Sequence, residues 1–229
     1  MIRAIARSLA LCAILLACAA LAAGAQDARL SARLDARTVT AVTRVLDSAR
    51  TRSLPTEPLV QKALQGAAKR APADRVVAAV RELLSELTVA RSALGARSTE
   101  AELVAGAGAL HGGVPAATLT RVRGLRGRDP VTVALGTLAD LVARGVPVDG
   151  AVSAIVTLAS RGASDADLVT FSNQVGRDIA AGAPPAVAAR VRAAGANSGA
   201  RPATVPGRPD NAPRGGGRRP AGQVPPGRP

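Results

Sequence analysis

A short join recurs through the middle of this chain and constrains its fold more than any other feature. Each copy has a residue that ends a helix, a small apolar residue, and a Pro or Ser that begins the next helix. Glycine suits the left-handed position after a helix, and Pro or Ser suits a helix start. The join therefore predicts consecutive short helices separated by tight turns. The copies are Arg70-Ala71-Pro72, Gly113-Val114-Pro115, Gly145-Val146-Pro147, Gly162-Ala163-Ser164 and Gly182-Ala183-Pro184.

The spacing of these joins predicts units of similar length. Two units make a helical hairpin of about 34 residues, which is the length scale of helical repeat proteins. We therefore expect an all-α fold of stacked αα-hairpins over residues 26–196, either as a bundle or as a short solenoid. The signatures of tetratricopeptide and ankyrin repeats are absent from the sequence. The expected helix starts are Ser98, Pro115, Pro130, Pro147 and Ser164.

Apolar periodicity and capping patterns bound individual helices. Helical spacing of Val and Leu predicts a helix over 36–51, with Asp35 as its N-cap, and a longest helix over 73–94. Two further helix starts have the spacing of a capping box, in which side chain and backbone at the helix start bond each other reciprocally. These pairs are Thr99 with Glu102 and Ser164 with Asp167.

The composition agrees with close-packed helices. The chain of 229 residues has 52 Ala, one Phe, and no Trp or Tyr, although 48% of its residues are hydrophobic. A core of Ala, Val and Leu lets helix axes approach closely, whereas a β-sandwich core favours β-branched and aromatic side chains. The lack of aromatic rings also argues against nucleic-acid recognition by base stacking.

The first 25 residues have the pattern of an export signal. Arg3 and Arg7 precede an apolar stretch over 8–23, and Ala23-Gly24-Ala25 supplies the small residues of a cleavage site. This predicts a signal peptide over 1–25 and a periplasmic or extracellular protein. Cleavage after Ala25 would remove both cysteines of the chain and leave no thiol.

A second interpretation of the same segment stays open. The sequence Leu15-Leu16-Ala17-Cys18 resembles the bacterial lipoprotein box. That resemblance implies lipidation of Cys18 and a membrane-anchored lipoprotein. Leu16 departs from the small or β-branched residue usual before the Ala.

The C-terminal segment 197–229 is rich in Gly, Pro and Arg. It carries six Arg and one Asp, a net charge of +5, and has too little apolar surface to fold by itself. We predict a disordered tail. One interpretation is an electrostatic tether to an anionic surface, and the other is a solvated terminus without a specific role.

The sequence contains little that points to catalysis. His111 is the only histidine, and it lies next to Gly112-Gly113 at an expected helix end. Without a second His or a Cys, the sequence predicts no metal site, no cofactor and no catalytic residue. We therefore expect a protein that is not an enzyme. An enzyme that uses His111 with a nearby carboxylate is the less favoured alternative.

Four arginines form the sharpest local feature. They are interrupted by Gly124 and Gly127 and precede Asp129-Pro130. Guanidinium groups at this density could bind phosphate or carboxylate groups, although a solvated basic loop explains the same pattern. The candidate anion-binding residues are Arg121, Arg123, Arg126 and Arg128.

Together these patterns favour an exported, non-catalytic helical scaffold of the bacterial cell envelope. Its partner would be a protein of unknown identity or an anionic envelope component. Membrane contact would arise only through lipidation of Cys18 or through the tail. The alternative is a protein that binds polyanions by charge alone, since the chain carries 30 basic against 16 acidic residues.

Overall fold

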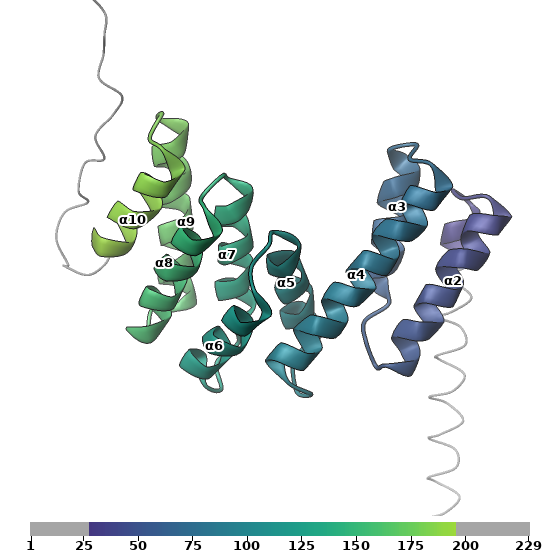
Figure 1. The fold of residues 1–229 in the computed structure, drawn as a ribbon, viewed down its shortest axis with the longest axis horizontal. Helices are drawn as coiled ribbons and strands as arrows, with labels where there is room; N and C mark the ends of the chain where they lie inside the picture. The colour runs from purple at the N-terminus through teal and green to yellow at the C-terminus, as the bar shows by residue number, and fades with distance from the viewer. Residues whose placement is uncertain (1–27, 196–229) are drawn as a thin grey trace, which may run out of the picture.

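The computed structural model describes residues 28–195, and these residues form helices and turns without a β-strand (Figure 1). The predicted all-α fold is thereby confirmed. The predicted signal peptide, Cys18 and the tail at 197–229 lie outside the described residues. After a helical turn at 28–31, the helices are α2 Ala36–Thr51, α3 Glu57–Ala68, α4 Ala73–Leu94, α5 Glu100–His111, α6 Ala116–Arg126, α7 Thr132–Ala143, α8 Val148–Ser160, α9 Asp165–Ala180 and α10 Pro185–Gly195.

The helices pack mainly on neighbours one or two positions away in sequence. One row consists of α2, α4, α6, α8 and α10, each in contact with the next member of the row. A second row consists of α3, α5, α7 and α9 and lies beside the first; in it α5 packs on α7 and α7 on α9 (Figure 1). Contacts limited to neighbours are typical of repeat solenoids, whose units stack along one direction. Of the two expected architectures, the described residues therefore form a short solenoid.

The recurrent joins have the predicted conformation. The glycines at 113, 145, 162 and 182 all have positive φ, from 76° to 93°. After α7, for example, the Gly145 N–H donates to the Val142 carbonyl and the Val146 N–H donates to the Leu141 carbonyl. This pair of bonds is the Schellman motif, and the residue after the glycine packs back on the helix. Val146 is accordingly buried.

The same turn also occurs without glycine. Arg70 has a φ of 53°, and Ser53 has a φ of 52° in a further join between α2 and α3. The sequence pattern identified the join at Arg70 but gave no bounds for α3 and missed the turn at Ser53. Its sequence, Ser53-Leu54-Pro55, has the Pro two residues on, as Arg70-Ala71-Pro72 does, but it has Leu in place of the small residue and lacks the glycine.

The side-chain N-caps predicted at Asp35, Thr99 and Ser164 are all present. Asp35 accepts a bond from the Thr38 N–H, and both predicted capping boxes are formed. The expected starts at Ser98 and Pro130 are each early by one residue, because Thr99 is the N-cap of α5 and Val131 is the N-cap of α7. The Ser98 hydroxyl instead donates to the Gly95 carbonyl at 2.7 Å.

The apolar core consists of Leu, Val and Ala side chains, with Ile155 and Phe171 as the two exceptions among the described residues. Close approach is seen at Gly106, where an added Cβ would lie 3.2 Å from side-chain atoms of Ala90, Leu94 and Leu119. Helices α4, α5 and α6 therefore pack with little intervening volume. Within residues 28–195, no helix has the length and hydropathy needed to cross a bilayer.

Candidate functional site

The arginine-rich segment lies at the end of α6, where several helix ends meet. Here Glu102 has three partners from three segments. Its Oε2 accepts from the Thr99 N–H at 2.9 Å, and its Oε1 accepts from the buried Val131 N–H at 3.1 Å. Its Oε1 also accepts from Arg123 in an ion pair. One carboxylate therefore holds together the starts of α5 and α7 and the last turn of α6.

Arg126 extends this connection to α9. Its Nη1 donates to the Ala163 carbonyl at 2.8 Å, and its Nη2 donates to the Pro130 carbonyl at 3.2 Å. The same Nη2 forms an ion pair with Asp165 at the start of α9. The Arg126 side chain is only 8% exposed. We call Glu102, Arg123, Arg126 and Asp165 the ion-pair junction.

The four arginines predicted to bind anions thus have two different environments. Arg123 and Arg126 have their guanidinium groups directed to carboxylates and carbonyls of the chain itself. Arg121 and Arg128 are exposed. An anion would meet two exposed guanidinium groups at this end of the molecule, and not a cluster of four. Anion binding by the segment stays a prediction.

The environment of Glu102 favours its charged form. Burial alone would raise the pKa of the Glu102 carboxyl, but hydrogen bonds from Thr99, Arg123 and Val131 outweigh burial and lower this pKa. Because these bonds exist only in the folded chain, the ionised carboxylate stabilises the fold at neutral pH.

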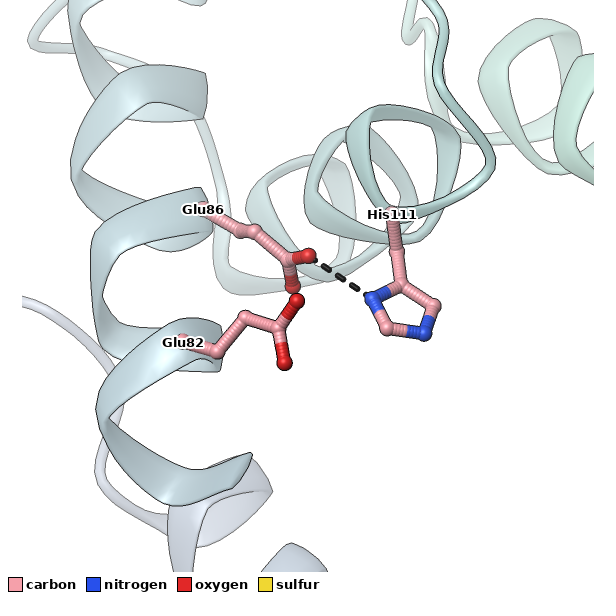
Figure 2. A group of neighbouring side chains, drawn as sticks. All are labelled: Glu82, Glu86 and His111. Carbon is pink, nitrogen blue, oxygen red and sulfur yellow. Dashed lines mark hydrogen bonds and ion pairs between the residues drawn. The ribbon is translucent and has the colours of Figure 1, made fainter. Parts of the chain in front are cut away.

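A second group of charged side chains lies between α4 and α5. His111, the last residue of α5, directs its Nδ1 to Oε1 of Glu86 on α4 at 2.8 Å (Figure 2). Glu82 lies one turn before Glu86, and ligand atoms from all three residues lie within 4.8 Å of one another. The His111 side chain is 55% exposed, so the group is open to solvent. We call Glu82, Glu86 and His111 the His111 cluster.

The His111 cluster has more negative than positive charge around it. Glu82 and Glu86 are four residues apart on α4, an arrangement in which like charges repel. Within the described ranges, no Lys or Arg forms an ion pair with either carboxylate. The C-terminal end of α5, where His111 lies, contributes further negative potential.

Sequence reasoning missed this cluster because it treated His111 as isolated. The two glutamates are 25 and 29 residues away in sequence, yet α4 and α5 bring them beside the ring. A pair of acidic residues at i and i+4 on α4, followed by a His at the end of the next helix, was the available signal. No Ser or Thr hydroxyl of the described residues bonds the ring, so the cluster places no hydroxyl nucleophile beside His111.

An apolar groove lies near this region, between α3 and α5. The second row of helices is interrupted there, because α3 and α5 both pack on α4 without an extensive contact of their own. Leu83 of α4 lines the groove together with Pro58 and Val104, and the groove has a volume of about 560 Å³. Val104 is 41% exposed and is thus one of the few large apolar side chains open to solvent.

The chain matches no protein-family model, no curated protein and no solved structure.

Proposed function

We propose that this chain is an exported, non-catalytic interaction scaffold that binds an amphipathic helix of a partner protein in the groove between α3 and α5. The observation that carries the proposal is the interrupted second row of helices. At every later step of the array a helix of that row packs on the next one, but between α3 and α5 an apolar groove takes this place. A groove with helical walls and an apolar floor suits an apolar helix face.

The lining of the groove specifies the chemistry of the partner helix. Pro58, Leu83 and Val104 would contact apolar side chains spaced one turn apart. Glu100, at the start of α5, also lines the groove and favours a basic residue on the partner beside it, whereas Lys62 of α3 favours an acidic one. The other acidic residue of the lining, Glu57, is already paired with Arg29 and is less available.

Val104 provides a direct test, with Val169 on α9 as its matched control. Both valines are exposed, at 41% and 48%, but only Val104 lines the groove. A photo-crosslinking residue at position 104 should give a discrete adduct with one envelope protein in cells, and the same residue at 169 should not. Val104→Glu, combined with a crosslinker at Gln61 on the opposite wall, should abolish the adduct. Equal adducts from 104 and 169 would contradict the proposal.

Export and tethering form the second part of this proposal. They rest on the sequence of residues 1–25 and on the +5 charge of residues 197–229. Intact-mass analysis of the mature chain should give a species that begins at Gln26, whereas lipidation would give one that begins at Cys18. Deletion of 197–229 should release the protein from the envelope fraction at low salt. Unchanged fractionation would contradict the tether.

Binding of polyanions by charge alone remains the alternative. Arg121 and Arg128 are exposed and support it, but the partners of Arg123 and Arg126 reduce the charge available at that end. Retention on heparin that falls steeply with salt would favour this alternative.

A further inference from the structure

We propose that Glu82, Glu86 and His111 form a binding site for a divalent cation of the zinc class. The three side chains come from two helices and converge on one solvent-accessible point (Figure 2). Glu82 and Glu86 project from the same face of α4, one turn apart, and His111 projects from the end of α5. This assignment is independent of the partner helix proposed above.

The separations of the ligand atoms fit such an ion. Zinc binds imidazole nitrogen and carboxylate oxygen at roughly 2.0–2.2 Å, which places tetrahedral ligand atoms about 3.3 Å apart. The Nδ1 of His111 and Oε1 of Glu86 are now 2.8 Å apart, and the most distant pair in the group lies within 4.8 Å. The required separation falls between these values. Side-chain rotation would therefore form the site without movement of either helix.

The donor set indicates the class of metal. One imidazole nitrogen and two carboxylate oxygens suit zinc and its neighbours in the first transition row, whereas calcium and magnesium prefer sites made of oxygen alone. Three protein ligands leave a fourth position for water or an external ligand. The 55% exposure of the His111 side chain gives that position access to solvent.

The electrostatics of the site favour a cation. The carboxylates repel each other at i and i+4, and within residues 28–195 neither has an Arg or Lys partner. This is notable in a chain with 30 basic residues. A bound divalent ion would neutralise both carboxylates and would face the negative end of α5. It would also cross-link α4 to α5, which form one wall and the floor of the apolar groove.

The test uses the full chain without a polyhistidine tag and with Cys12→Ser and Cys18→Ser, so that neither a tag nor a thiol binds metal. Calorimetric titration with zinc at neutral pH should show one saturable site, and magnesium should bind at least about tenfold more weakly. Because His111 is the only histidine, every imidazole signal in the NMR spectrum belongs to it. These signals should shift on addition of zinc.

Substitution of each ligand then separates this site from adventitious binding. His111→Gln, Glu86→Gln and Glu82→Gln should each raise the dissociation constant for zinc by about tenfold or more. Asp149→Asn, an exposed acidic residue in the first turn of α8, is the control and should leave it unchanged. Absence of saturable binding, an unmoved His111 resonance, or any ligand variant that binds as tightly as the control would overturn the proposal. Circular dichroism of each variant confirms that its helices remain folded.

Discussion

The ion-pair junction and the His111 cluster both join helices through charged side chains, but they balance charge in opposite ways. In the junction, two arginines face two carboxylates, and their Nη groups also donate to backbone carbonyls, while the Nε of each is buried without a partner. In the His111 cluster, two carboxylates face one imidazole. A largely buried charge that loses its partner destabilises the fold, whereas an excess of one sign leaves capacity for a ligand. The difference indicates a structural role for the first group and a binding role for the second.

The largest expected effect is at Glu102. Glu102→Ala removes the acceptor of the buried Val131 N–H, the partner of Arg123 and half of the α5 capping box. Breaking a largely buried ion pair from one side destabilises a protein by about 3 kcal/mol. Urea unfolding followed by circular dichroism should show this loss. Glu100→Ala, in the same first turn but exposed, is the control. Equal losses from the two variants would show that Glu102 acts only through the helix dipole.

A smaller loss is expected at Arg126, whose carboxylate partner is partly exposed. Arg126→Ala leaves the carbonyls of Pro130 and Ala163 without their donor and Asp165 without its cation. We expect a loss of about 2 kcal/mol in the free energy of unfolding. Arg121→Ala, at an exposed position of the same helix, should change it by less than about 0.5 kcal/mol. If both arginines contributed equally, the segment would be a solvated basic loop and not a junction.

The stabilising contribution of the ion-pair junction to the free energy of unfolding should be lost in acid. Burial alone would raise the pKa of Glu102, but its hydrogen bonds outweigh burial and hold the folded-state pKa below the ordinary value of a glutamate carboxyl. Its stabilising contribution is therefore complete above that value and is lost as the pH falls through the folded pKa. Unfolding free energies of the wild-type chain and of Glu102→Gln should differ most at neutral pH and converge in acid. A constant difference from neutral to strongly acidic pH would contradict this assignment.

The structural features that could be predicted from the sequence are those that depend on residues close together in the chain. Caps, glycine turns and the bounds of α2 and α4 follow from residues a few positions apart, and all of them were confirmed. The bond from Val131 to Glu102 spans 29 residues and depends on how two hairpins stack. For the same reason, the sequence grouped four arginines by proximity, whereas the fold directs Arg123 and Arg126 to carboxylates on other helices.

The smallest expected effect is a gain in stability, and it arises at Glu82 in the His111 cluster. It tests most directly whether this cluster differs from the ion-pair junction. In the absence of metal, Glu82→Gln removes a like-charge repulsion with Glu86, and neither residue has a basic residue three or four positions away on α4. The chain should therefore become more stable by about 0.3 kcal/mol. With saturating zinc the wild-type chain should be the more stable of the two. It retains all three ligands, so it binds the ion more tightly and gains more free energy from binding. Thermal unfolding in chelator and in zinc measures both signs. If loss of the Glu82 carboxylate destabilised the metal-free chain, as we expect for loss of Glu102, the His111 cluster would be a second structural junction and the distinction between the two groups would fail.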